Sequence, residues 1–114
     1  MPTILAVGRD EQLLITRSAI FRNIGAEVVE TNSTEAAKIL KAKRVDLVVL
    51  CHTLTAKEMV EIASLAHQQQ AGIRVLQLIS ARREGREPEY VDADAVAPVR
   101  PQALVAMVSQ LLTH

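Results

Sequence analysis

Aromatic side chains are nearly missing from this chain, in which Phe21 and Tyr90 are the only two and tryptophan does not occur. Any hydrophobic core must therefore be aliphatic, and with 49% of its residues hydrophobic the chain has enough apolar side chains to build one. Cysteine is scarce as well. The single Cys51 excludes an internal disulfide, which fits a reducing compartment, and we expect a cytoplasmic protein.

Neither sign of charge is in excess, since 13 basic residues balance 13 acidic ones. This balance gives no electrostatic reason to expect nucleic acid or an anionic membrane surface as a partner. No apolar run approaches the roughly 20 residues that cross a bilayer. Residues 1–4 do not begin a secretory signal, which would pair a basic region with an apolar one. We therefore expect neither nucleic acid nor a membrane among the binding partners.

Short apolar runs predict five buried strands. They cover residues 3–7, 27–30, 46–51, 73–79 and, more weakly, 93–96. Runs that are apolar at nearly every position are typical of strands covered on both faces, as in a parallel sheet. The length of 114 residues suits one domain spanning 1–114, and because the chain ends with its last helix we expect no output domain within it.

Amphipathic helices are predicted between these strands. Asp10 can cap the first helix, which Gly25 ends, and Asn32 and Thr55 are each followed three residues later by glutamate, as in a capping box. The inward face of the first helix is predicted to consist of Leu13, Leu14, Ile20, Phe21 and Ile24. Pro101 suits the first turn of the last helix. Strands that alternate with helices in this way indicate an α/β fold with helices on both faces of the sheet.

One segment breaks the alternation. Residues 81–91 are crowded with charged side chains, contain Gly85 and Pro88, and have no apolar stripe that a helix could bury. We expect a solvated loop or at most one helical turn here, so the fourth of five helices would be shortened or missing. A binding element in this segment remains an alternative.

Five short motifs resemble the bacterial response-regulator receiver domain, the CheY-like family, over residues 3–113. The matching segments are residues 4–7, 25–30, 46–50, 79–81 and 97–98. The resemblance implies a flavodoxin-like, doubly wound, three-layer sandwich with a five-stranded parallel sheet in the order 2-1-3-4-5. It also implies a pocket at the carboxyl ends of the strands, lined by Gly8, Arg9, Asp10, Cys51, Ser80, Ala97 and Pro98.

The chain departs from the receiver pattern at most positions that carry the family's chemistry. The resemblance places Gly8 and Arg9 where the family has two acidic residues that hold Mg²⁺. It places Cys51 at the position of the aspartate that accepts phosphate, and Ala97 at that of the lysine beside it. Only Ser80 keeps the expected hydroxyl. We therefore expect no metal, no cofactor and no catalytic residue, and not an enzyme.

Two of these positions allow more than one interpretation. Arg9 could take over part of the electrostatic role of the metal, or its side chain could simply extend into solvent. Cys51 could be a reactive thiol if Arg9 lowered its pKa, or a small and inert residue at the end of a strand.

The resemblance implies a place in two-component signalling. We expect a pseudo-receiver that acts by binding a protein partner or a second copy of itself, without conventional aspartate phosphorylation. One alternative is a thiol or small-ligand sensor that uses Cys51 and the former acceptor pocket. Another is a structural or dimerisation module cut from a larger regulator.

Overall fold

Five parallel strands form the centre of the molecule, in the order β2-β1-β3-β4-β5. The structure, a computed structural model, describes residues 1–70, 72–79 and 94–112. The strands are β1 (Thr3–Val7), β2 (Glu27–Thr31), β3 (Leu47–Leu50), β4 (Arg74–Ile79) and β5 (Ala95–Pro98). The parallel sheet and its strand order are those predicted.

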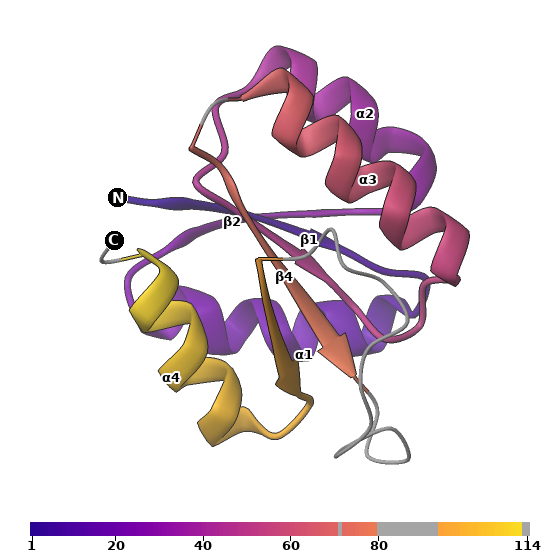
Figure 1. The fold of residues 1–114 in the computed structure, drawn as a ribbon. Helices are drawn as coiled ribbons and strands as arrows, with labels where there is room; N and C mark the ends of the chain where they lie inside the picture. The colour runs from indigo at the N-terminus through magenta and orange to yellow at the C-terminus, as the bar shows by residue number, and fades with distance from the viewer. Residues whose placement is uncertain (71, 80–93, 113–114) are drawn as a thin grey trace.

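Helices cover both faces of this sheet (Figure 1). On one face lie α2 (Ser33–Ala42) and α3 (Ala56–Gln69), and on the other lie α1 (Glu11–Asn23) and α4 (Pro101–Leu112). This arrangement is the predicted doubly wound, three-layer sandwich of the flavodoxin-like type. The predicted shortening of a helix within residues 81–91 lies outside the described residues.

The core consists of two layers, one on each side of the sheet. In β1, Ile4 and Ala6 pack toward α1 and α4, whereas Leu5 and Val7 pack toward α2 and α3. All four side chains are fully buried because successive residues of a strand point to opposite faces, and both faces are covered. This double burial is the physical reason that the strands read as continuous apolar runs.

Helix α1 buries the predicted apolar face together with two polar residues that were not predicted. Its buried residues are Leu14, Arg17, Ser18 and Phe21, which share one face at helical spacing. The predicted inward residues Leu13, Ile20 and Ile24 are only half-buried. Ile20 and Ile24 still pack against the core layer that contains Leu14 and Phe21. The prediction missed Arg17 and Ser18 because it counted apolar residues alone.

The helix boundaries follow the predicted capping residues. Asp10, Asn32 and Thr55 each accept a hydrogen bond from the backbone N–H three residues later, and Thr55 and Glu58 form a complete capping box. Gly25 has a φ of 95°, the left-handed conformation expected after α1. Turn and cap chemistry was thus readable from the sequence.

Strand β5 begins two residues later than predicted, at Ala95 rather than residue 93. The cause is Asp94, whose N–H donates to the Val75 carbonyl at 2.8 Å. The Asp94 carboxylate accepts from the Val75 N–H at 2.7 Å and lies 2.9 Å from Nε2 of His67. Because the Asp94 side chain takes the place of a strand carbonyl here, the regular backbone hydrogen bonds between β4 and β5 start only at Ala95.

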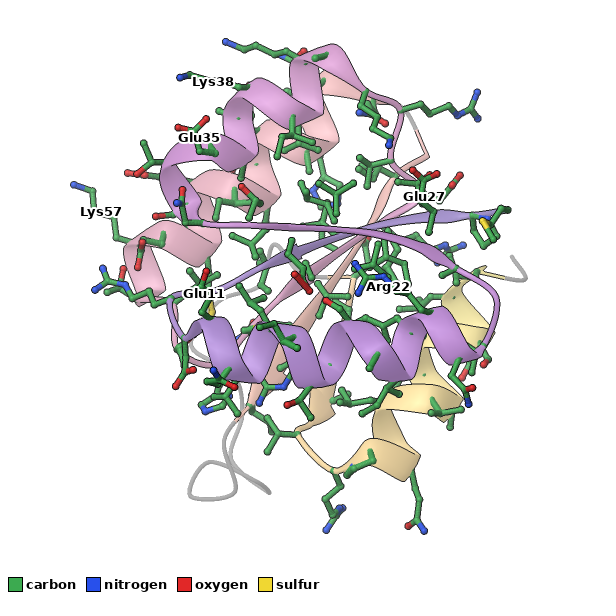
Figure 2. The ribbon with its side chains drawn as sticks, turned by 180° about the vertical axis from the view of Figure 1, so that it is seen from behind. Glu11, Arg22, Glu27, Glu35, Lys38 and Lys57 are labelled. Atoms are coloured by element: carbon green, nitrogen blue, oxygen red, sulfur yellow. The ribbon has the colours of Figure 1, made fainter. Side chains whose placement is uncertain are left out.

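Charged side chains lie on the outer surfaces of the helices. Figure 2 shows Glu35 and Lys38 projecting from α2, where they form an ion pair at 3.6 Å, and Lys57 projecting from α3. Among the described residues, no helix has both the length and the apolar character needed to span a membrane.

Candidate functional site

Cys51 directly follows the end of β3 and lies inside the core. Its N–H donates to the Val7 carbonyl at 2.9 Å, and its side chain is only 1% exposed. It belongs to the core layer that contains Leu14 and Phe21. Burial raises the pKa of the Cys51 thiol, and the nearby Arg17 guanidinium offsets only part of this effect. The group at the end of β3 is therefore a protonated and inaccessible thiol at neutral pH.

Gly8 packs against this thiol. A β-carbon at position 8 would lie 3.1 Å from Cβ of Cys51 and 3.3 Å from Cδ2 of Leu14. Both distances are shorter than ordinary carbon–carbon contacts, so any side chain at position 8 would have to displace a neighbour. The space above the end of β1 is thus filled by Cys51 and Leu14.

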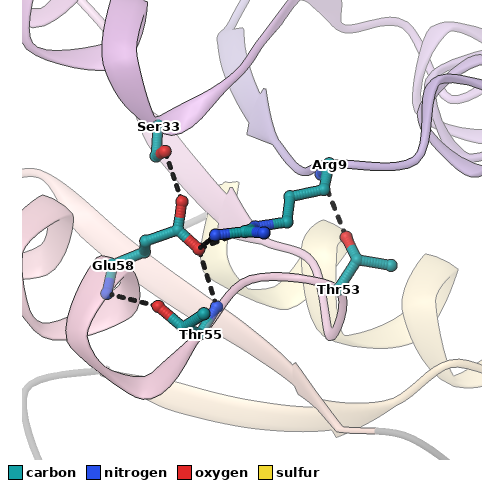
Figure 3. Close-up of polar contacts among 5 residues, drawn as sticks. All are labelled: Arg9, Ser33, Thr53, Thr55 and Glu58. Atoms are coloured by element: carbon teal, nitrogen blue, oxygen red, sulfur yellow. Dashed lines mark hydrogen bonds and ion pairs between the residues drawn. The ribbon is translucent and has the colours of Figure 1, made fainter.

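Arg9 does not extend freely into solvent. Its Nε and Nη2 atoms each lie 2.9 Å from Oε1 of Glu58, and Figure 3 shows the two side chains pointing toward one another. The Arg9 N–H donates to Oγ1 of Thr53 at 3.1 Å. The Arg9 side chain remains 59% exposed. Arg9 thus joins the β1–α1 connection to α3, and its charge is directed at Glu58.

Partial burial alone would raise the pKa of Glu58. Hydrogen bonds from Ser33, from the Thr55 N–H and from Arg9 outweigh that effect and lower its pKa to about 2. Glu58 is therefore ionised at neutral pH. The sequence identified this residue only as part of a capping box, because the partner that approaches from 49 positions away cannot be seen in a local pattern.

Arg17 lies beside Cys51 and His52 and was not predicted from the sequence. It is 5% exposed, and its Nη2 atom lies 3.1 Å from Nδ1 of His52. Because a guanidinium only donates, Nδ1 must accept, which leaves the His52 proton on Nε2. Burial, and then the charge of Arg17, lowers the pKa of His52. Within the described ranges, Nη1 of Arg17 has no hydrogen-bond partner.

The other predicted pocket residues differ in their surroundings. Ala97 is 1% exposed and shares the core layer of Cys51. Pro98 is the last residue of β5 and is paired with Ile79 of β4, and the peptide bond before it is trans. Asp10 is engaged as the cap of α1, where it accepts from the Leu13 N–H at 3.2 Å. Ser80 lies outside the described residues.

A cavity of about 380 Å³ opens at this edge of the sheet, but it is displaced from Cys51. Its walls come from the ends of β1 and β2 and the start of α1: Gly8, Arg9, Glu11, Leu14, Glu30, Thr31 and Asn32. Of the predicted pocket residues that the structure describes, only Gly8 and Arg9 border it. The structure therefore brings Gly8, Cys51 and Ala97 together in the core and directs Arg9 away from them.

Solved structures with this architecture include receiver domains of response regulators. A CheY-like receiver domain protein from Methanospirillum hungatei superimposes with a TM-score of 0.82 at 20% identity, covering 99% of this chain and 94% of its own. The chain has the fold of a CheY-like receiver domain. No family model matches the sequence, and no curated protein matches it.

The receiver fold also occurs in more varied settings. A chain from the complex of the histidine kinase ThkA with the response regulator TrrA superimposes with a TM-score of 0.81 at 21% identity, covering 98% of this chain and 99% of its own. A protein named for pilus assembly, from Burkholderia thailandensis, gives 0.74 at 16% identity, with all of both chains covered. Since one fold carries differently named proteins, the function must be argued from the site.

Proposed function

We propose that this chain is a pseudo-receiver, a receiver-like signalling domain that works by binding a protein partner and not by aspartate phosphorylation. Residues 1–114 would act as one such unit, with no enzymatic activity and no cofactor of their own. The observation that carries the proposal is the end of β3. An oxygen nucleophile is needed there for phosphoryl transfer, and the structure has the thiol of Cys51, 1% exposed and packed against Gly8.

The surrounding donors support the same proposal, because they do not suit Mg²⁺. That ion prefers oxygen ligands, carboxylates above all. At the end of β1 the chain offers a glycine with no side chain, a guanidinium already paired with Glu58, and Asp10, which caps α1. No cluster of three histidine, cysteine or acidic side chains occurs in the part of the chain that the structure describes.

The sensor alternative receives less support from the geometry. A thiol reacts through its thiolate form, and burial raises the pKa of Cys51. Arg9, which could have activated the thiol, is instead bound to Glu58 in the first turn of α3. These contacts favour an inert Cys51.

Phosphorylation with a small phosphodonor tests the proposal. The purified chain would be incubated with acetyl phosphate and Mg²⁺, beside a receiver with an intact acidic site as the positive control, and followed by intact-mass spectrometry. We expect the control to gain one phosphoryl group and this chain to gain none. An acid-stable or acyl phosphate on this chain, or magnesium-dependent NMR shifts confined to residues 8–10 and 51, would overturn the proposal.

A partner can be sought with the same protein. The kinase-bound neighbour shows that one response regulator is recognised by a histidine kinase, and we propose that this chain is likewise recognised by a protein of a signalling pathway. Affinity capture with the wild-type chain, followed by measured binding of the purified candidate, would identify it. Size-exclusion chromatography with light scattering would show whether a second copy is a partner.

A further inference from the structure

Glu58 collects hydrogen-bond donors from three segments that are far apart in the sequence. Its Oε1 atom accepts from Arg9 on the β1–α1 connection and from the Thr55 N–H at 2.9 Å, just before α3. Its Oε2 atom accepts from the hydroxyl of Ser33 in the first turn of α2. Figure 3 shows the Arg9 and Ser33 side chains and the Thr55 backbone N–H converging on one carboxylate.

This group is more constrained than an ordinary surface ion pair. Exposed pairs contribute about 0–1 kcal/mol because water competes and two flexible side chains must be ordered. Here the Glu58 side chain is only 16% exposed. The capping box fixes it to its own helix, and the N–H of Arg9 is separately held by Thr53. Charge-assisted bonds with such fixed geometry are among the stronger polar contacts of a protein.

We propose that Arg9, Ser33, Thr55 and Glu58 form a permanent clamp that holds the carboxyl edge of the sheet in one arrangement. A cation carried by the chain itself links the β1–α1 connection to α3, so this link cannot dissociate as a bound metal ion would. The inference rests on the proposed function, because a clamp within the chain leaves no step for a phosphoryl group to control. The domain would present one constant surface to its partner.

Hydrogen exchange of the complete chain tests the clamp without any phosphodonor or metal ion. The variant Glu58→Gln removes the charge but keeps an amide oxygen that can complete the capping box. We expect amides of residues 8–10, 31–33 and 53–55 to exchange about tenfold faster than in the wild type, with residues 75–78 of β4 unchanged.

Two further variants make the test specific. Glu61→Gln neutralises an exposed carboxylate on the same helix, and its exchange should match that of the wild type. Arg9→Gln should accelerate residues 8–10 and 53–55, and adding it to Glu58→Gln should cause little further change, because both remove the same contact.

The clamp is refuted if Glu58→Gln and Arg9→Gln exchange no faster than Glu61→Gln at these amides. This result would leave the phosphorylation experiment untouched, since a chain without a clamp can still lack an acceptor. Conversely, a chain that becomes phosphorylated while the clamp variants behave as expected would overturn the proposed function alone.

Discussion

Replacing Arg17 by methionine should make the protein more stable. Burying a guanidinium costs several kcal/mol, and Nη1 of Arg17 recovers none of this cost through a hydrogen bond to any described residue. The contact that is lost to Nδ1 of His52 is worth about 1.5–3 kcal/mol, and the contact to the Cys51 thiol adds little because sulfur is a weak acceptor. His52 is only half-buried, so water can replace that donor. Methionine has a similar length and fills the space with apolar atoms, and the balance favours the variant by about 1–2 kcal/mol.

Urea denaturation at pH 7 measures this difference, and thermal unfolding should show a rise of several degrees. The matched control is Arg22→Met on the same helix. Its half-exposed side chain donates to the Val28 carbonyl at 3.3 Å and lies 3.9 Å from Glu30, so this variant should lose no more than about 1 kcal/mol. A second readout is the pKa of His52, which Arg17 helps to lower. NMR titration should find that pKa raised in the variant. A loss of more than 1 kcal/mol in Arg17→Met would refute the reasoning and would mean that the guanidinium has an additional partner.

Three further predictions concern the same edge of the sheet. Glu58, with its pKa lowered from 4.5 to about 2, supports folding above pH 4.5, and this support is lost as the pH falls toward 2. The full lowering corresponds to about 3 kcal/mol, and because Arg9 is exposed we expect Glu58→Gln to lose about 1–2 kcal/mol at pH 7 in urea denaturation. At pH 3 the loss should be about half of that, since much of the stabilisation remains above a pKa of about 2. Equal losses at both pH values would contradict the assignment. Gly8→Ala should destabilise by about 1–2 kcal/mol through contact with Cys51, and an unchanged urea midpoint would show that the site has room. Thiol labelling of Cys51 should be about a hundredfold slower in native buffer than in urea, and equal rates would show that the thiol is accessible.

Much of the fold could be predicted because local patterns and tertiary structure agree. The apolar runs at β1 and β3 are continuous since helices cover both faces of the sheet, and Asp10, Asn32 and Thr55 cap the helices that they precede. The start of β5 was missed because Asp94 binds Val75 through its side chain. The strand propensity of aspartate is the same whether its carboxylate takes the place of a strand carbonyl or faces water.

The site was predictable in its residue types but not in its contacts. The positions of Gly8, Arg9 and Cys51 followed from the ends of two predicted strands. The pairing of Arg9 with Glu58 and the burial of Arg17 against His52 did not, because each joins residues separated by 35 positions or more. One local feature did indicate that Arg17 is buried, because it lies between Leu14 and Phe21 on the same helical face. A method that counts only apolar residues ignores this feature.

The close contact between Gly8 and Cys51 bears on how such a domain could change over evolutionary time. An aspartate introduced at position 8 alone would collide with the β-carbon of Cys51 and with Leu14. An aspartate introduced at position 51 alone would bring a carboxylate into an aliphatic layer beside Ala97, where no lysine stands. Each single substitution that adds a carboxylate at one of these positions is thus penalised before a second substitution can compensate. Because Gly8 and Cys51 pack against each other across adjacent strands, successive point substitutions are a costly route to an acidic site at this edge of the sheet.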